Sequence, residues 1–292
     1  MKTKFHVVVT VCVLAIAAAV VAFAARSSRG QARPSNRNAS VKPAVRVTES
    51  TPSKASAFTA AAGQNAALRN ELSWTFGGKQ QRGWYLYDLL IGKTLNTHDD
   101  PLTVDFAEDL ASWQKKRGLS ADGVLDQDSL MALVSQWQSV RLKNRTPAQP
   151  DQLMTAPPSD FYDPGRAAEL RQVERKTYDA YKEMIAAAAV DLKLAPTSKY
   201  LKIVSSYRSP EYQEELRRKS PNAGSAGLAV NNSPHFTGRA LDMYVGGSPV
   251  DTKDSNRAIQ VETPAYKWLV RNAERFGFRP YFYEPWHWEY VK

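Results

Sequence analysis

The sequence predicts an α+β fold, in which a small helical module precedes a domain with a small antiparallel sheet flanked by helices. The first half carries apolar residues at helical spacing, whereas the second half mixes helical stretches with short alternating or aromatic ones. Because these helices and strands do not alternate strictly, they indicate the α+β class. With 43% hydrophobic and 23% charged residues, the chain can bury a core of ordinary composition.

Residues 1–25 are typical of a targeting segment. Lys2 and Lys4 precede the uncharged, mostly apolar run 7–23, and Ala22-Phe23-Ala24 resembles a small-x-small cleavage site. The run is close in length to a membrane span, so the segment is either a cleaved signal peptide or an uncleaved membrane anchor. Either one exports the rest of the chain to the cell envelope, on its periplasmic or extracellular face.

Residues 26–65 predict a flexible linker, because they are rich in Ser, Arg, Ala, Pro and Asn and show no sustained apolar period. The net charge of +10 admits nucleic acid, an anionic membrane surface or an anionic polymer as partner. No basic run is interleaved with aromatic residues, so we expect no nucleic-acid partner. The single cysteine, Cys12, lies in the targeting segment, which excludes a disulfide framework or a cysteine nucleophile in the folded part.

Residues 74–140 predict a small helical module. Phe106, Leu110 and Trp113 recur at helical spacing, and the basic residues before Gly118 are a helix stop. Asp122-Gly123 is a turn signal. Asp126 or Asp128 is positioned to cap a further helix that carries the apolar residues Leu130, Leu133 and Val134.

The string from Phe106 to Leu130 resembles the peptidoglycan-binding three-helix domain. The pair Trp113-Gln114, then Gly118-Leu119, then Asp122-Gly123-Val124 follow that family's order. The sequence departs from the family at Leu125-Asp126, where a second glycine is usual. The resemblance implies that the module binds peptidoglycan; the alternative is a generic pair of helices.

Residues 141–160 contain four prolines among polar residues and predict a second linker, and the second domain spans 161–292. The expected elements of this domain are a long helix over 167–192, a strand over 202–206, a helix over 210–219, a Gly/Asn/Ser-rich loop over 221–233, a strand over 240–245, a helix over 263–276 ended by Gly277, and an aromatic strand over 281–291 broken by Pro285.

The second domain holds two of the chain's four histidines, His235 and His287, each close in sequence to a carboxylate. His235 precedes Asp242 in Ser233-Pro-His235-Phe-Thr-Gly238-Arg-Ala240-Leu-Asp242, and His287 follows Glu284 in Glu284-Pro-Trp286-His287. A catalytic zinc site keeps three nitrogen or oxygen ligands and one open position. His235, Asp242 and His287 are the simplest such set, and two histidines with one aspartate favour Zn²⁺. Each residue alone has an ordinary explanation as a turn, capping or strand residue; their joint occurrence favours a site.

The motifs S-x-H-x-x-G-x-A-x-D and E-x-W-H resemble the D-alanyl-D-alanine carboxypeptidase and dipeptidase family of zinc peptidases, which includes VanY- and VanX-type enzymes. The resemblance covers about residues 165–292. It implies that His235, Asp242 and His287 bind zinc and that Glu284 is the general base.

A Tyr-Arg-Ser stretch followed by a glutamine, also typical of this family, is present as Tyr207-Arg208-Ser209 and Gln213. The resemblance implies that Arg208 binds and polarises the substrate, because a guanidinium donates two parallel hydrogen bonds to a carboxylate or oxyanion. The alternative is a surface ion pair with Glu211. Two further residues complete the expected substrate site with Gln213: Ser233, and Trp286, which either walls a pocket for a D-Ala methyl group or packs in the core.

The resemblance implies a zinc D,D-carboxypeptidase that removes the terminal D-Ala of peptidoglycan stem peptides. One alternative is a relative that cuts another bond, such as L-Ala–D-Glu, or a free dipeptide. Another is a non-catalytic zinc protein that binds the cell wall, which the presence of all four site residues disfavours. A serine mechanism is discounted, because the only Ser-x-x-Lys spacing, Ser112 to Lys115, lies in the helical module.

Overall fold

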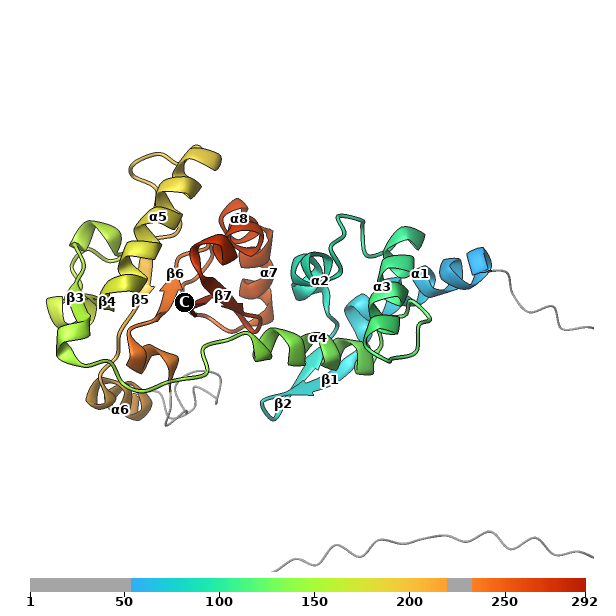
Figure 1. Ribbon diagram of the computed structural model, residues 1–292, viewed down its shortest axis with the longest axis horizontal. Helices are drawn as coiled ribbons and strands as arrows, with labels where there is room; N and C mark the ends of the chain where they lie inside the picture. The colour runs from blue at the N-terminus through green and yellow to red at the C-terminus, as the bar shows by residue number, and fades with distance from the viewer. Residues whose placement is uncertain (1–53, 220–232) are drawn as a thin grey trace, which may run out of the picture. The chain divides into compact units, whose positions relative to one another are not determined.

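A computed structural model describes residues 54–219 and 233–292 (Figure 1). The predicted targeting segment, most of the predicted linker 26–65 and nearly all of the expected loop 221–233 lie outside these residues. Within the described part of the chain, no helix combines the length and the apolar character needed to cross a membrane. Anchoring by residues 7–23 therefore stays a prediction.

The module begins with a helix that the sequence analysis missed. Helix α1 spans Lys54–Glu71, so residues 54–65 are helical rather than part of a linker. Phe58 and Ala61 of this helix belong, with Ala107 of the module, to a separate apolar cluster. Asn65 fixes the helix further, because its side-chain amide donates to the Gly123 carbonyl at 2.9 Å and its oxygen accepts from the Leu125 backbone N–H at 2.7 Å. Alanine forms helices without an apolar period, which is why the pattern did not reveal it.

The rest of the module contains one small antiparallel hairpin and three more helices. The predicted helices exist, and the capping choice falls on Asp126, whose carboxylate accepts from the Ser129 backbone N–H at 2.9 Å. Gly118 ends the preceding helix with a φ of +70°, a conformation that favours glycine. The elements are β1 (Ser73–Phe76), β2 (Lys79–Arg82), the 3₁₀ turn η1 (Tyr85–Tyr87), α2 (Asp88–Leu95), α3 (Val104–Lys116) and α4 (Gln127–Ser139).

Residues 141–160, expected to form a linker, lie against the C-terminal half, residues 161–292, instead. The Ala148 backbone N–H donates to the Phe236 carbonyl at 2.8 Å. Strand β3 (Leu153–Thr155) pairs antiparallel with β4 (Gln172–Glu174), and the 3₁₀ turns η2 (Pro150–Gln152) and η3 (Pro158–Asp160) flank β3. Prolines suit such short turns, so proline content alone does not distinguish an ordered connecting segment from a flexible linker.

The C-terminal half is built on a four-stranded antiparallel sheet, which confirms the α+β class (Figure 1). The strand order is β5-β6-β8-β7, with β6 and β8 in the middle and almost entirely buried. The strands are β5 (Ile203–Ser205), β6 (Ala240–Met243), β7 (Phe278–Tyr281) and β8 (Glu284–Tyr290). The helices are α5 (Arg175–Asp191), α6 (Pro210–Lys219), α7 (Asp254–Glu262) and α8 (Pro264–Asn272), with the 3₁₀ segments η4 (Ala168–Arg171), η5 (Pro234–Thr237) and η6 (Ala273–Phe276).

Two predicted boundaries in this half are wrong. The helix expected from residue 167 begins at Arg175, because Glu174 caps it by accepting from the Thr177 backbone N–H at 2.7 Å. The strand expected over 281–291 is not broken at Pro285: the chain turns before Glu284, and β8 runs through the proline. The pairing of β8 with β6 covers only residues 287–289, so Pro285 removes no hydrogen-bond donor that β6 requires.

One aromatic cluster joins the module to the C-terminal half. Phe282, in the turn between β7 and β8, packs its ring 4.7 Å from that of Phe76, 5.4 Å from Tyr87 and 5.7 Å from Trp137, measured between centroids. The same hydrophobic core extends from Trp74 to Trp288. The module and the C-terminal half therefore share buried apolar surface.

Candidate metal centre

The first motif forms a tight turn that leads into the sheet. The Ser233 hydroxyl accepts from the His235 backbone N–H at 3.3 Å and so caps η5. Gly238 ends this turn with a φ of +66°, and a Cβ at this position would lie 2.9 Å from the Glu174 backbone nitrogen. Only glycine fits such a turn without strain. The turn fixes His235 just before β6, whose third residue is Asp242.

The second motif lies on the neighbouring strand. β6 and β8 pair antiparallel, and the register places Asp242 directly opposite His287. Residues opposite each other in an antiparallel pair carry their side chains on the same face of the sheet. Sheet register therefore brings together two residues that are 45 positions apart in the sequence.

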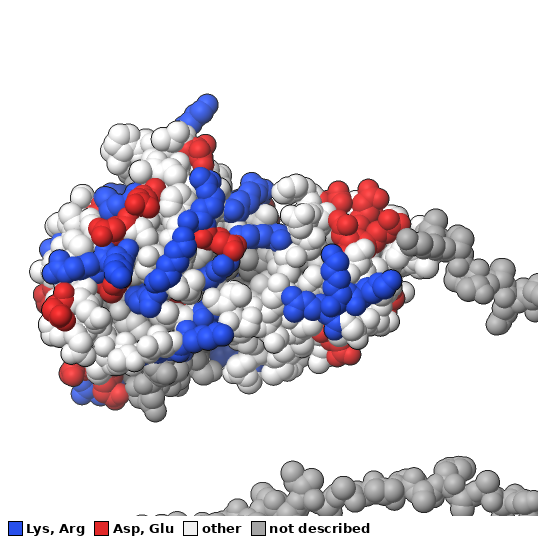
Figure 2. All heavy atoms as spheres, in the orientation of Figure 1, with Lys and Arg blue, Asp and Glu red and all other residues white. Residues whose placement is uncertain are grey.

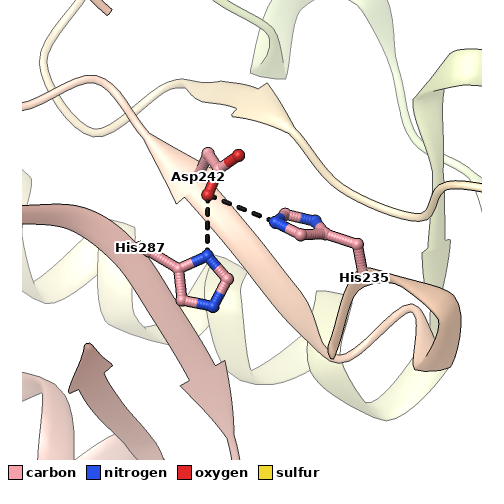
Figure 3. Close-up of side chains that lie close together, drawn as sticks. All are labelled: His235, Asp242 and His287. Atoms are coloured by element: carbon pink, nitrogen blue, oxygen red, sulfur yellow. Dashed lines mark hydrogen bonds and ion pairs between the residues drawn. The ribbon is translucent and has the colours of Figure 1, made fainter. Parts of the chain in front are cut away.

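The three predicted ligands converge on one point (Figure 3). Oδ1 of Asp242 lies 3.3 Å from Nε2 of His235 and 2.9 Å from Nδ1 of His287. One potential ligand atom from each residue lies within 4.8 Å of the others, and all three side chains are buried. Two imidazole nitrogens and one carboxylate oxygen are the donor set of a catalytic zinc site, so the residues present fit this metal.

The ring nitrogens that face away from this point are also occupied. Nδ1 of His235 lies 2.6 Å from the Ser206 carbonyl oxygen, and Nε2 of His287 lies 3.2 Å from Oε1 of Glu289. Both oxygens are acceptors, so these nitrogens carry ring protons, and Nε2 of His235 and Nδ1 of His287 are the nitrogens that a metal would use. Such outer partners fix the tautomer and the orientation of ligand histidines.

In the metal-free site, the electrostatics favour one charging proton at neutral pH, carried by His287. Burial, assisted by the charge of Arg208, lowers the pKa of His235 to about 4. Burial alone would raise the pKa of Asp242, but His235, His287 and Arg208 hold it well below its usual range. Burial alone would lower the pKa of His287, but hydrogen bonds to Asp242 and Glu289 raise it to about 9. His235 is then neutral, Asp242 ionised and His287 protonated.

Arg208 contacts the metal centre directly. One terminal nitrogen of its guanidinium lies 2.7 Å from Oδ2 of Asp242, and its Nε donates to the Ser205 hydroxyl at 3.0 Å. The guanidinium thus pairs with Asp242, so the alternative of a surface ion pair with Glu211 does not describe its main contact. A cation held at this edge can bind a developing oxyanion.

Glu284 begins β8 and is 8% exposed. Burial raises the pKa of its carboxyl to about 7; the charge of Asp242 adds to this effect, whereas those of His287, Arg208 and Arg141 oppose it. The charges of the predicted ligands Asp242 and His287 thus act on the Glu284 carboxyl. A carboxyl with a pKa near the working pH suits a general base.

The three expected substrate-binding residues are all buried. The Ser233 hydroxyl caps η5, and Gln213 is in α6, where its backbone N–H donates to the Ser209 carbonyl. Trp286 packs in the hydrophobic core, which establishes its packing role. Substrate contact by Ser233, Gln213 or Trp286 stays a prediction.

Two residues of the site escaped the sequence analysis. Glu289 follows His287 by two positions on a strand, a spacing that places both side chains on one face, and this signal was available. Arg141 bonds to Glu289 from 148 positions away, and no local pattern reveals it. Ser112 and Lys115 lie in α3 of the module, where the sequence pattern placed them.

Comparisons with known proteins give one family match and several solved structures. Residues 170–292 match the family VanY, D-alanyl-D-alanine carboxypeptidase. The LdcB LD-carboxypeptidase is 27% identical, with 49% of this chain and 69% of that chain covered and a TM-score of 0.36. A vancomycin-resistance D,D-pentapeptidase VanY variant in complex with Zn(II) is 19% identical, with 53% and 89% covered and a TM-score of 0.32. VanYB in complex with D-alanine-D-alanine is 23% identical, with 53% and 87% covered and a TM-score of 0.32. No curated protein matches the chain.

Proposed function

Residues 170–292 form a domain of the VanY family of D-alanyl-D-alanine carboxypeptidases, and we propose that the protein is a zinc D,D-carboxypeptidase that removes the terminal D-Ala of peptidoglycan stem peptides. The family predicted from the two motifs is confirmed, and with it the assignment as a metallopeptidase. The D-Ala–D-Ala bond itself is the proposed part.

The observation that carries the proposal is the convergence of His235, Asp242 and His287 with Arg208 beside them. The three ligands supply a buried metal site, Arg208 supplies a cation at its edge, and Glu284 supplies a base whose pKa lies near neutrality. All these residues come from the family-matched region. A non-catalytic binding protein has no need of a buried base and an oxyanion-binding cation in one site.

The residues divide the chemistry among them as follows. Zinc, when bound, supplies a Lewis acid that activates water and polarises the scissile carbonyl. Glu284 accepts a proton from the attacking water and delivers it to the leaving amine nitrogen of D-Ala. Arg208 has N–H donors beyond those that bind Asp242 and Ser205, and they stabilise the negative charge that develops on the carbonyl oxygen.

We propose peptidoglycan as the polymeric partner and the cell envelope as the location. The N-terminal segment 1–25 supports export or membrane anchoring, and the resemblance of the helical module to a peptidoglycan-binding domain supports binding to the wall. Figure 2 shows Lys and Arg side chains spread over the visible face of the peptidase half, with acidic side chains between them. A basic surface favours association with stem peptides, which carry carboxylates.

Product analysis tests this function. The full-length protein, loaded with zinc, is incubated with a pentapeptide stem ending in D-Ala-D-Ala and, separately, with the corresponding tetrapeptide, and the products are identified by mass spectrometry. We expect release of one alanine from the pentapeptide, and loss of this activity with a chelator or with Glu284→Gln. Glu262→Gln is the matched control, because its side chain is 72% exposed and bonds only to Lys267 among the described contacts. Cleavage of the tetrapeptide alone, or an internal cut, would contradict the proposed bond.

A further inference from the structure

Arg141 and Glu289 form an ion pair beside His287, one of the predicted metal ligands. Arg141 follows the end of α4, and its Nε donates to Oε1 of Glu289 at 3.1 Å, while a terminal nitrogen bonds to the same oxygen. The neighbouring Leu142 backbone N–H donates to Oε2 at 2.9 Å. The Glu289 side chain is 0% exposed and that of Arg141 is 12% exposed. Both carboxylate oxygens are thus bonded by two consecutive residues of one segment.

The same carboxylate holds a predicted metal ligand. Oε1 of Glu289 lies 3.2 Å from Nε2 of His287, and the opposite ring nitrogen, Nδ1, lies 2.9 Å from Asp242. His287 and Glu289 are two positions apart on β8, so their side chains share one face of the strand. A continuous set of contacts therefore runs from Arg141 through Glu289 to the imidazole that faces the metal site.

Arg141 is itself fixed by two further contacts. One terminal nitrogen of its guanidinium donates to Oε1 of Gln138 at 2.9 Å, and its central carbon lies 3.9 Å from the centroid of the Tyr281 ring. The Tyr281 ring packs edge-on against that of His287, with 5.9 Å between centroids. Arg141 is thus connected to His287 through the Tyr281 ring as well as through Glu289. A planar guanidinium that is both stacked and bonded as a fork is not replaced by lysine without loss.

We propose that Arg141 is a positioning residue for the metal ligand His287. It fixes the Glu289 carboxylate, which in turn fixes the tautomer and the ring orientation of His287. Removing Arg141 would leave a buried carboxylate short of a partner, free to turn away from His287 or to draw in water. The VanY match begins at residue 170, so metal affinity in this chain depends on a segment that lies before its family domain. This inference rests on the metal site of the proposed function.

Zinc affinity measured by competition with a chromophoric chelator, at one pH, tests the inference on the full-length protein. We expect Arg141→Ala to raise the Kd for zinc about tenfold, the lower end of the range for outer partners of metal ligands. Arg141→Lys keeps the positive charge and should fall between the two. Arg69→Ala is the matched control, because it removes an arginine–carboxylate pair with Asp88 inside the module, and its Kd should equal that of the wild type.

Two results would overturn the inference: a folded Arg141→Ala protein with the wild-type Kd, or an equal loss of affinity in Arg69→Ala. If Arg141→Ala does not fold, NMR of the wild-type zinc form decides. There the Nε2 proton of His287 should exchange slowly with water because Glu289 accepts it, and a proton in fast exchange would contradict the proposed set of contacts. A wild-type protein that binds no zinc would instead refute the metal site of the proposed function.

Discussion

Replacing Glu284 with glutamine should stabilise the metal-free protein at alkaline pH and remove most of the activity of the zinc-loaded protein. Burial raises the pKa of this carboxyl from 4.5 to about 7. A carboxyl whose pKa is raised by folding stabilises the folded protein fully only when the pH is below its pKa in the unfolded chain. This stabilisation is lost as the pH rises through the pKa in the folded protein, and above that pH the buried carboxyl is charged. Each pKa unit corresponds to about 1.4 kcal/mol, so the ionised carboxylate costs about 3 kcal/mol above pH 7.

Glutamine has nearly the same shape and no charge, so the variant avoids this cost. We expect its free energy of unfolding in urea, with a chelator present, to exceed that of the wild type by up to about 3 kcal/mol at pH 8 and to match it more closely near pH 4.5. Activity of the zinc-loaded variant should fall by about 10² to 10⁴, the range for loss of a general base. Glu262→Gln, at an exposed carboxylate, should change neither quantity.

The measurement of stability and the measurement of activity test two different properties of Glu284. A variant that is no more stable than the wild type at pH 8 would show that Glu284 is not a desolvated carboxylate in the folded protein. A variant that is more stable but fully active would show that the buried carboxylate is not the base. Greater stability with lost activity excludes misfolding as the reason for inactivity.

Three further outcomes follow from the same geometry. The pKa of His287 is raised to about 9 in the metal-free protein, so zinc must displace a proton from this imidazole when it binds. The Kd for zinc should therefore fall roughly tenfold for each pH unit from 7 to 9, and calorimetry in two buffers should detect the release of about one proton. A Kd independent of pH would refute this. Arg208→Lys should lower kcat/KM for alanine release by about 10² with the zinc content unchanged, because lysine cannot donate the two parallel hydrogen bonds that a guanidinium donates to an oxyanion. Wild-type kinetics in this variant would argue against a role of Arg208 in catalysis. Phe282→Ala should lower the free energy of unfolding by about 3–5 kcal/mol, because the cavity would open among several buried aromatic rings; a loss below about 1 kcal/mol would show that the shared core contributes little.

The sequence was most informative where chemistry requires particular residues at short spacing. The turn that delivers His235 needs Gly238 in a left-handed conformation, and the strand that follows places Asp242 three residues into the sheet-forming segment that begins at Ala240. Both features appear in the motif itself. The meeting of Asp242 with His287 was expected from the resemblance, whereas its cause, the register of β6 against β8, was visible only in the structure.

The sequence was least informative where small residues or long-range contacts decide the structure. Helix α1 has no regular apolar stripe, because apart from Phe58 the buried apolar residues of the helix are alanines. Residues 141–160 have the composition of a linker, but contacts such as those of Arg141 and Leu142 with Glu289 hold this segment against the sheet. Sequence distance hides these contacts, since nothing local to either segment specifies the other.

Anomalous diffraction at the zinc absorption edge tests the central claim most directly. Crystals of the zinc-loaded protein should show one strong anomalous peak, within about 2.0–2.2 Å of Nε2 of His235, Nδ1 of His287 and a carboxylate oxygen of Asp242. Such a peak, with Glu284 and Arg208 beside it, is what a metallopeptidase centre built from these residues requires. A peak coordinated by other residues, or no bound zinc in protein that was loaded with it, would contradict the account.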